Sequence, residues 1–380
     1  MIRNRFRKAY SGELFDTVEC DETAREQLGN RMARMRLADI AAQAGVSPAT
    51  VSKYLNGHHK EMSEVTRERI AAVIERTGYR PNSVARNLRL ERSRTIGVIL
   101  ADIRNPYSSA MLEELSAQAT ASDYALTCAI SGNDPAKETA ALDRLLEAGV
   151  DGLIVNTCGG NDDRLRAIDR RVPVVLLDRD LAPQPDSEGK PSPALDLVTS
   201  NNTELVTGLV NKVAGTNHTA CTRIHLLTEN DPTSPVRRER ALTFMRELSA
   251  HWLAGSTLAL PSNPREAARM LAELADAYIP LGLIAINGLV FQQLVEAISL
   301  SGLLVPERLR IATFDEYSWN RVLFGGVTTA AQDTRAIAHA VLERLHARIT
   351  DETKAPETSG GSTWRREIPG NIIPRASTRD

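Results

Sequence analysis

The sequence predicts an α/β protein that has a small all-helical domain near its N-terminal end and a large domain built on two parallel sheets. Residues 35–81 contain short amphipathic helices joined by turn residues. From residue 95 onward, β-branched apolar runs alternate with helical patterns in two successive series, which is typical of parallel sheets covered on both faces. The length of 380 residues suits this division because it exceeds that of one typical domain.

The helical segment begins with two short helices, over 37–44 and 48–55. The first has apolar residues at helical spacing, at Leu37, Ile40, Ala41 and Ala44. Gly45 supplies the turn because it reaches positive φ without a steric penalty. Ser47 is a good N-cap, and Pro48 stands at the first helical position, where no N–H is needed.

The second helix is predicted to bury Val51 and Leu55. Its outer face is small, polar or basic and consists of Ala49, Thr50, Ser52 and Lys53. A helix with such a face fits the major groove of DNA. The alternative is an ordinary αα-hairpin, but the segments that follow favour the DNA-binding interpretation.

A third helix is predicted over 65–78, with apolar residues at 65, 70, 73 and 74 and a glycine C-cap. The next stretch, 79–94, is rich in arginine and contains one acid, Glu91. Asn82 can cap a helix over 83–90, which is shorter than the ~12–15 residues that an isolated helix needs for stability. We hypothesise that this helix folds only on DNA, where phosphates neutralise its arginines.

Four motifs carry a resemblance to a known family: AxxAGVSxATVSxxLNG, TRERI, GYRPNxxARxLR and RTIGVI. Together they resemble the LacI–GalR family of bacterial transcription regulators, from about Met35 to the C-terminus. The resemblance implies a cytoplasmic homodimer that reads double-stranded palindromic operator DNA, with a hinge helix whose leucine wedges into the minor groove. The DNA-binding residues that it implies are Ser47, Pro48, Ala49, Thr50, Ser52, Lys53, Asn56, Arg86 and Leu88. Lys53 departs from the family's usual arginine and lacks the bidentate fork that reads guanine.

Strands of the first series are predicted at 95–101, 125–130, 151–156 and 172–178, with helices at 109–121, 137–148 and near Leu165. The second series has strands at 195–200, 223–228, 282–287 and 310–315, with helices near Leu205 and at 235–250, 264–277 and 289–301. Two such sheets in sequence suggest two Rossmann-like lobes that face a cleft, where ligands bind at the carboxyl ends of strands. The resemblance implies the same periplasmic-binding-protein-like effector domain.

These patterns give the expected domain boundaries. They are a disordered extension at 1–34, a helix-turn-helix domain at 35–81, a hinge helix and linker at 82–94, and an effector-binding and dimerisation domain at 95–380. The two lobes are expected at about 95–195 plus 334–363 and at 196–331 plus 364–380. For residues 1–34 two interpretations stay open, a flexible arm or a translation start at Met35.

Several polar residues follow predicted strands, where the cleft is expected. The resemblance implies that the effector contacts are Tyr107, Asp178, Arg179, Arg240, Asn287, Asp315, Trp319 and Gln332. The guanidinium of Arg240 suits a carboxylate or ring oxygens, and Tyr107 is placed to stack on the ligand. For each residue alone, a structural role such as helix capping is the alternative.

The sequence also departs from the family pattern around this cleft. The usual Asn-Asp is Asn287-Gly288, and the usual Asp-Asn is Asn201-Asn202. Two lost acidic positions favour an anionic ligand. Asn287-Gly288, together with Phe314-Asp315 and a nearby tryptophan, resembles family members that sense sugar acids. The resemblance thus implies a sugar or sugar acid as the small-molecule effector, with a purine or a phosphosugar as alternatives.

Composition narrows the function classes. The net charge is −2, so the chain as a whole is not basic. Its charge is uneven, because the DNA-binding segment is basic and the remainder is correspondingly acidic. The four cysteines, Cys20, Cys128, Cys158 and Cys221, lack metal-ligand spacing and are expected to be free thiols, mostly buried. No run of ~18 apolar residues predicts a membrane span, and the N-terminal residues lack the apolar region of a secretion signal.

The competing class is a carbohydrate-acting enzyme with an appended DNA-binding module. The sequence has no GxSxG elbow, P-loop or HExxH motif, so we expect no catalytic site, metal or cofactor. A secreted sugar-binding protein is a further alternative, which the helix-turn-helix pattern disfavours. No leucine heptad follows Arg375, so we expect no coiled-coil tetramerisation tail, and a dimer is the simplest assembly. Met111, Leu112 and Leu115 are expected either in its interface or in the core.

Overall fold

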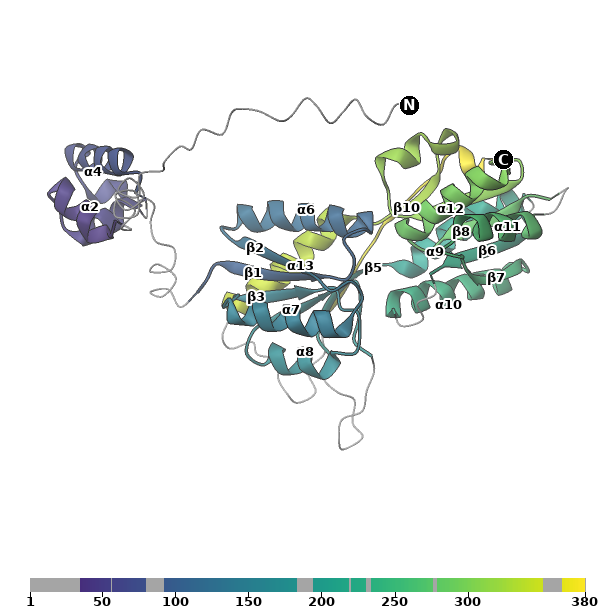
Figure 1. The fold of residues 1–380 in the computed structure, drawn as a ribbon, viewed down its shortest axis with the longest axis horizontal. Coiled ribbons are helices and arrows are strands. Elements are labelled where there is room, and N and C mark those ends of the chain that lie inside the picture. Colours follow the sequence, from purple (N-terminus) through teal and green to yellow (C-terminus); the bar gives the residue numbers. More distant parts are fainter. Residues whose placement is uncertain are drawn as a thin grey trace, which may run out of the picture. The chain divides into compact units, whose positions relative to one another are not determined.

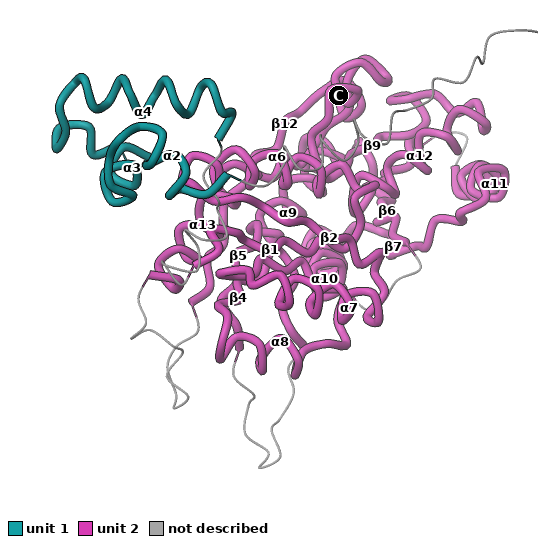
Figure 2. Tube along the Cα trace, turned by 60° about the vertical axis from the view of Figure 1, so that its left-hand side comes forward, with its two compact units in different colours: residues 1–91 teal, residues 92–380 magenta. Residues whose placement is uncertain are grey.

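The computed structural model describes residues 35–55, 57–79, 92–182, 194–218, 220–229, 234–275, 279–350 and 364–379. The chain separates into two compact units, 1–91 and 92–380 (Figure 2). Each unit has its own hydrophobic core, and each is described by itself below. None of the helices in the described ranges is long and apolar enough to cross a membrane.

The small unit contains three α-helices in its described part, α2 (Leu37–Ala44), α3 (Pro48–Leu55) and α4 (Glu64–Thr77). Gly45 ends α2 at a φ of 63°, as the turn requires. Ile40, Val51 and Ile70, one from each helix, are fully buried and form the centre of the core. The predicted packing of Val65 is wrong, because α4 turns this side chain outward and leaves it 66% exposed.

The first sheet of the large unit has six parallel strands in the order β11-β5-β4-β3-β1-β2. They are β1 (Thr95–Leu100), β2 (Ala125–Ile130), β3 (Gly152–Val155), β4 (Val174–Leu177), β5 (Asp196–Ser200) and β11 (Arg365–Ile368). Helices α6 (Pro106–Ala121) and α13 (Thr334–Thr350) cover one face, and α7 (Pro135–Glu147) and α8 (Asp162–Asp169) cover the other (Figure 1).

The second sheet has the order β12-β10-β9-β8-β6-β7, and only β12 runs antiparallel to its neighbour. Its strands are β6 (Arg223–Thr228), β7 (Ala254–Ala259), β8 (Leu281–Ala285), β9 (Leu309–Phe314), β10 (Thr328–Ala331) and β12 (Asn371–Ile373). Its helices are α9 (Asn202–Ala214), α10 (Pro235–Ala250), α11 (Pro264–Leu274) and α12 (Gly288–Ser301). Short 3-10 turns lie at His59–Glu61, Thr216–His218, Ser318–Arg321, Leu323–Gly325 and Ala376–Thr378.

The chain passes between the two sheets three times, after β5, after β10 and after β11. The predicted lobe boundaries are therefore wrong at two places. We assigned 196–200 and 364–368 to the second lobe, but β5 pairs with β4, and β11 pairs with β5, in the first sheet. Apolar alternation identifies a strand but carries no information about its partner, so the sequence pattern placed both strands by chain order alone.

Other local predictions were also corrected. The helix predicted at 109–121 starts at Pro106, because the Asn105 side chain accepts a hydrogen bond from the Tyr107 N–H and caps it. Strand β7 was not predicted; it is an edge strand whose side chains are only partly buried.

Two further predictions concern side-chain burial. Met111 and Leu115 are fully buried under the first sheet, which favours the core over the interface for both. Cys158 and Cys221 are buried free thiols, but Cys128 is exposed because β2 is an edge strand.

Candidate functional site

The exposed face of α3 is the first candidate site. Ser47, Pro48, Ala49 and Lys53 are exposed, and Thr50 and Ser52 are half-buried. The Ser47 Oγ accepts a hydrogen bond from the Thr50 N–H at 3.1 Å and lies 2.9 Å from the Thr50 hydroxyl. Ser47 thus caps the helix as predicted, and the two hydroxyls hold each other in place at the start of α3. Asn56, Arg86 and Leu88 lie outside the described residues.

Lys53 has a partner within the small unit. Its Nζ lies 2.7 Å from an Oε of Glu61, with about half of each side chain exposed (53% and 50%). The hydrogen bond and charge of Lys53 hold the pKa of Glu61 below its usual range, so this carboxylate stays ionised. An ammonium group is a point charge that exchanges partners easily, so Lys53 can leave Glu61 for a nucleic acid.

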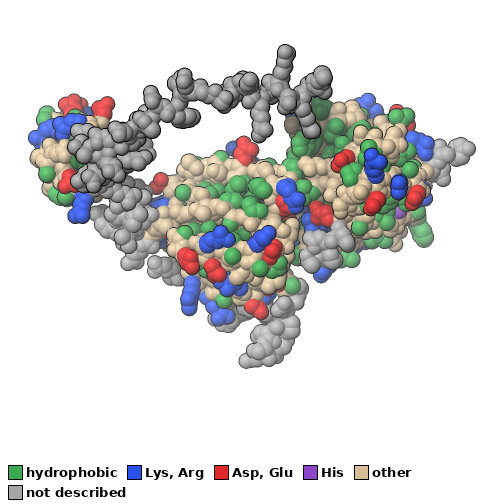
Figure 3. All heavy atoms as spheres, in the orientation of Figure 1, with side chains coloured by type: hydrophobic (Ala, Val, Ile, Leu, Met, Phe, Trp, Pro, Cys, Tyr) green, Lys and Arg blue, Asp and Glu red, His purple; other side chains and the backbone are tan. Residues whose placement is uncertain are grey.

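Charge is distributed differently on the large unit. On the face drawn in Figure 3, the Lys and Arg side chains of the large unit lie among its Asp and Glu side chains. The described part of the chain contains no cluster of three or more His, Cys, Asp or Glu side chains that is arranged to hold a metal ion. On the large unit, the candidate binding site is therefore sought among the buried charged residues.

Arg240, on α10, is the centre of a buried polar cluster at the carboxyl ends of the second sheet's strands. Its side chain is 4% exposed, and its Cζ lies 3.8 Å from the ring centroid of Phe314. Its Nε donates to Asn202 at 2.8 Å and its Nη1 to the Ile286 carbonyl at 2.8 Å. Its Nη2 donates to Gln332 Oε1 at 3.3 Å. The guanidinium is thereby held in one orientation by groups from three elements.

Asp315 and Gln332 complete this cluster. Gln332 Nε2 donates to Asp315 Oδ1 at 2.6 Å, and the Ser200 hydroxyl donates to Gln332 Oε1 at 2.7 Å. Burial raises the pKa of Asp315, although Arg240 and Gln332 oppose that effect. We call Arg240, Asp315, Gln332, Asn202 and Ser200 the cleft cluster. Because Ser200 ends β5 and Gln332 follows β10, the cluster lies on two of the three crossovers between the sheets.

Tyr107 and Asp178 face the same cluster from the first sheet. The pKa of the Tyr107 phenol is raised by burial, then by the charges of Asp178 and Asp315, whereas Arg240 lowers it. The Tyr107 hydroxyl and the Asp178 Oδ1 are buried, and neither has a hydrogen-bond partner among the described residues. Buried polar atoms are normally paired, so these two atoms are candidates for contact with a ligand.

Two carboxylates of this region, Asp178 and Asp315, lie at strand ends with an unusual backbone conformation. Asp178 and Asp315 each follow a strand and have φ values of 67° and 72°. Aspartate tolerates this left-handed region better than most side chains, and such outliers concentrate at binding sites.

The other predicted effector residues lie differently. Asn287 caps α12 by accepting from the Val290 N–H at 2.9 Å, and its amide donates to Glu229 at 2.9 Å. Arg179 points into the first sheet's loops, where it donates to Asn133 at 2.9 Å and to the Thr157 carbonyl at 3.2 Å. Trp319 has 41% of its surface exposed. The structure thus brings Arg240, Asp315 and Gln332 into contact with one another and leaves Trp319 at the surface.

Ser200 and Tyr317 were not predicted as parts of this site, and Asn202 was named only as a departure from the family pattern around it. Asn202 and Ser200 bond directly to the cleft cluster, and Tyr317 contacts it through Asp315. Ser200 is the last residue of β5 and Asn202 follows it by two positions, so the rule that selected Asp315 could have selected them. Tyr317 follows its strand by three residues, inside a loop whose path the sequence does not specify.

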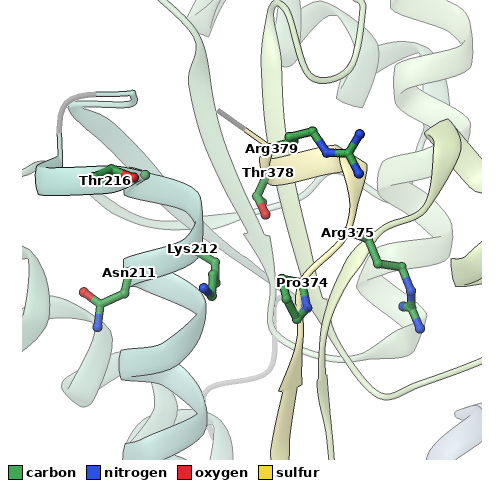
Figure 4. Close-up of a pocket in the computed structure, with 8 residues that line it drawn as sticks. Asn211, Lys212, Thr216, Pro374, Arg375, Thr378 and Arg379 are labelled. Atoms are coloured by element: carbon green, nitrogen blue, oxygen red, sulfur yellow. The ribbon is translucent and has the colours of Figure 1, made fainter.

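A pocket with a volume of about 520 Å³ lies elsewhere on the described surface (Figure 4). It is lined by Asn211, Lys212, Gly215, Thr216, Pro374, Arg375, Thr378 and Arg379. Arg310, near the start of β9, donates to the Lys212 and Thr378 carbonyls beside it. The pocket is therefore at the amino ends of the strands, the edge opposite to the cleft cluster. Arg375 is already paired with Glu316 at 2.7 Å, which gives it a structural role.

Comparisons with known proteins agree with the division of the chain into a small helical unit and a large unit with two sheets. Residues 36–82 match the family model of bacterial regulatory proteins of the lacI family, and residues 218–378 match a periplasmic binding protein-like domain. This chain is 32% identical to the HTH-type transcriptional regulator PtxS of Pseudomonas plecoglossicida, in an alignment that covers 92% of this chain and 98% of the relative. The HTH-type transcriptional regulator KdgR of Bacillus subtilis is 30% identical over 85% of this chain and 93% of its own.

Solved structures show the same fold. The lac repressor bound to ONPG in its repressed state superposes with a TM-score of 0.71 at 22% identity, covering 90% of this chain and 99% of that one. The Cra regulator of Pseudomonas putida in complex with fructose 1-phosphate superposes with a TM-score of 0.60 at 23% identity, covering 74% and 98%. At these identities the likeness concerns the architecture alone.

Proposed function

This chain belongs to the lacI family of bacterial regulatory proteins, and we propose that it is a repressor whose operator affinity is set by a sugar or sugar acid bound in the cleft. It regulates transcription by binding DNA through its helix-turn-helix unit. Beyond family membership and DNA binding, the proposal assigns the face that reads the operator, the site that binds the effector, and the coupling between the two sites.

The observation that carries the DNA-binding part is the outer face of α3. Pro48, Ala49 and Lys53 are exposed there, while Val51 anchors the helix in the core of its unit. Small residues let the helix approach the base edges closely, Ala49 offers a methyl to a thymine, and Lys53 offers a cation. A homodimer places two such helices on the two halves of a palindromic operator.

The effector part rests on the cleft cluster. Arg240 offers a guanidinium, and two atoms from the opposite sheet that have no partner among the described residues, the Tyr107 hydroxyl and Asp178 Oδ1, offer a donor and an acceptor. A polyhydroxy compound that bonds to both sheets holds them together, as small-molecule sites with convergent polar groups do. Because Ser200 and Gln332 lie on the crossovers, ligand contact there changes the angle between the sheets.

The signal then has a route to the DNA-binding unit. The Asp151 carboxylate accepts hydrogen bonds from the Ser93 N–H at 2.7 Å, the Ser93 hydroxyl at 2.9 Å and the Arg94 N–H at 2.9 Å. The start of the large unit is therefore clamped to the first sheet and must follow it. A hundredfold change in operator affinity requires a coupling free energy of only about 2.7 kcal/mol.

Two measurements test the proposal. Selection of DNA from a random pool should yield an inverted repeat that the full chain prefers over scrambled duplex, with a preference that a bound effector changes. A thermal-shift screen of sugars and sugar acids identifies the effector, because a ligand that binds the native state raises the melting temperature. Absence of an inverted-repeat preference, or turnover of the compound that binds, would contradict the proposal.

A further inference from the structure

The pocket in Figure 4 is separate from the cleft cluster, because it lies at the amino ends of the strands of the second sheet. Its walls come from two segments, the end of α9 with the turn after it and the segment that follows β12. We call it the amino-end pocket. Its volume of about 520 Å³ falls within the range of small-molecule sites, about 300–1,000 Å³, so it has room for a metabolite.

The charged side chains of the amino-end pocket are all cations. Three of its eight lining residues are basic and none is acidic. The side chains of Lys212 and Arg379 are exposed, and neither has an ionic partner among the described residues. Arg375 differs, because its two Nη atoms bind the Glu316 carboxylate at 2.9 and 2.7 Å. Lys212 and Arg379 are therefore the two cations that this pocket offers to a ligand.

Asn211 adds a further donor group to the same wall. Its Oδ1 accepts a hydrogen bond from His218 Nε2 at 3.0 Å, since an amide oxygen cannot donate. The His218 ring is itself stacked on His251, with ring centroids 4.0 Å apart. The amide nitrogen of Asn211 thus keeps both of its N–H groups, which have no partner among the described residues.

The carboxyl end of α9 forms part of the pocket, and such an end by itself disfavours an anion. The last carbonyls of a helix carry partial negative charge. Here Arg310, which is 4% exposed, donates from Nε to the Val213 carbonyl at 2.7 Å and from Nη2 to the Lys212 carbonyl at 3.1 Å. A buried cation therefore offsets the charge of the helix end, and the donors of the pocket can act on an anion.

The donors of the amino-end pocket favour a phosphate ester. Guanidinium and ammonium groups bind phosphate oxygens strongly, and a phosphate monoester carries a charge of about −1.5 to −2 at neutral pH. The pocket is larger than a single phosphate ion needs, so it has room for the organic part of an ester. None of the eight lining residues is aromatic, so they offer no ring on which a nucleobase could stack.

We propose that the amino-end pocket is a second ligand site, which binds the phosphate group of a sugar phosphate through Lys212 and Arg379. This site is distinct from the effector cleft of the proposed function, and either assignment can fail without the other. Helix α9 runs from this pocket to Asn202 of the cleft cluster, so a ligand here contacts an element that also belongs to the effector site.

The test is calorimetric titration of the full chain with glucose 6-phosphate and ribose 5-phosphate, with the two parent sugars, and with inorganic phosphate. At least one ester should bind about tenfold or more tightly than its parent sugar and than inorganic phosphate. Lys212→Gln combined with Arg379→Gln should lose about tenfold or more of that affinity. Lys137→Gln combined with Arg238→Gln removes the same charge from exposed side chains elsewhere and should bind as the wild type does.

The effector cleft is the competing location for a sugar phosphate. Because the double substitution at 212 and 379 leaves the cleft unchanged, full retention of the ester affinity would place the ligand in the cleft and overturn the inference. Failure of both esters to bind, or equal affinity for an ester and its parent sugar, would overturn it as well. Equal affinity for inorganic phosphate would overturn the assignment of an ester and leave a site for free phosphate.

A second measurement uses the unaltered chain and locates the ligand directly. Acetylation by acetic anhydride, followed by mass spectrometry, measures how fast each lysine reacts. The ester that binds, at about ten times its Kd, should slow acetylation of Lys212 about tenfold, because only about a tenth of the sites stay empty. Lys137 should react at an unchanged rate. An unchanged rate at Lys212, or equal slowing of both lysines, would overturn the proposed site.

Discussion

The outer face of α3 and the cleft cluster differ in how their side chains are held. Pro48, Ala49 and Lys53 are exposed, and Lys53 has a single ionic partner at the surface. Arg240 is 4% exposed and bonds to three groups from separate elements. A residue on the helix face can therefore change without disturbing its neighbours, whereas a residue of the cluster cannot.

Because of this difference, substitutions at the two sites should affect different measured properties. A substitution on α3 should change DNA binding and leave stability almost untouched, since surface substitutions are usually within about 0.5 kcal/mol. A substitution in the cluster should change stability and ligand response together, because a buried charge that loses its partner stays unpaired. The following predictions test that contrast, from the largest expected effect to the smallest.

Arg240→Ala should lower the free energy of unfolding by about 3 kcal/mol, because Asp315 loses its nearby cation and Asn202 its donor. It should also abolish the ligand-induced rise in melting temperature and spare operator affinity in protein that remains folded. Denaturant unfolding and DNA titration measure the two effects. Arg238→Ala, an exposed arginine on the same helix, is the control; an equal loss of stability in both variants would remove the contrast.

Lys53→Ala should weaken operator binding by about tenfold to a hundredfold, the usual cost of a lost base contact, without lowering the melting temperature. Binding to random duplex should weaken much less. Lys137→Ala, an exposed lysine on α7, should leave both kinds of binding unchanged. Equal weakening on operator and random duplex would assign Lys53 to the phosphate backbone instead of a base.

Asp315 and Glu316 are adjacent and should show opposite pH dependence. Burial raises the pKa of Asp315, so its contribution to stability is present below about pH 3.8 and is lost as the pH rises through the higher folded-state value. Although burial opposes it, hydrogen bonds from Arg375 and Arg321 lower the pKa of Glu316. Its contribution is present above about pH 4.5 and is lost as the pH falls through the lower folded-state value.

Unfolding experiments between pH 3 and 8 test this opposition. Glu316→Gln should cost about 1 kcal/mol at neutral pH and nothing in acid. The free energy of unfolding of Asp315→Asn, relative to that of the wild type, should be higher at neutral pH than in acid. Parallel pH curves for the two variants would contradict the assigned directions.

Glu61→Gln should give the smallest change. Removing the carboxylate frees Lys53 from its ion pair and removes a negative charge near the DNA-reading face, so binding to any duplex should tighten slightly. The salt dependence of binding, measured with operator and random duplex, shows the effect. Unchanged binding at low salt would mean that the Lys53–Glu61 pair does not compete with DNA.

The sequence alone determined the helix-turn-helix unit and the positions of most strands and helices. Gly45, Ser47 and Pro48 fix a turn and a helix start through their own backbone preferences, which act between near neighbours in the chain. The positions of Asp178 and Asp315 directly after β4 and β9 could likewise be predicted, since this needs only the end of an apolar run.

Only the tertiary structure decided which lobe holds β5 and β11 and which side chains meet in the cleft. Arg240 and Gln332 are 92 residues apart, and Ser200 and Gln332 are 132 apart. The close approach of the Tyr317 phenol to Gly288 also comes from a separate loop. Such contacts depend on how the sheets and their crossovers pack, and hydrophobic periodicity carries no information about that packing because it reports burial without naming the partner.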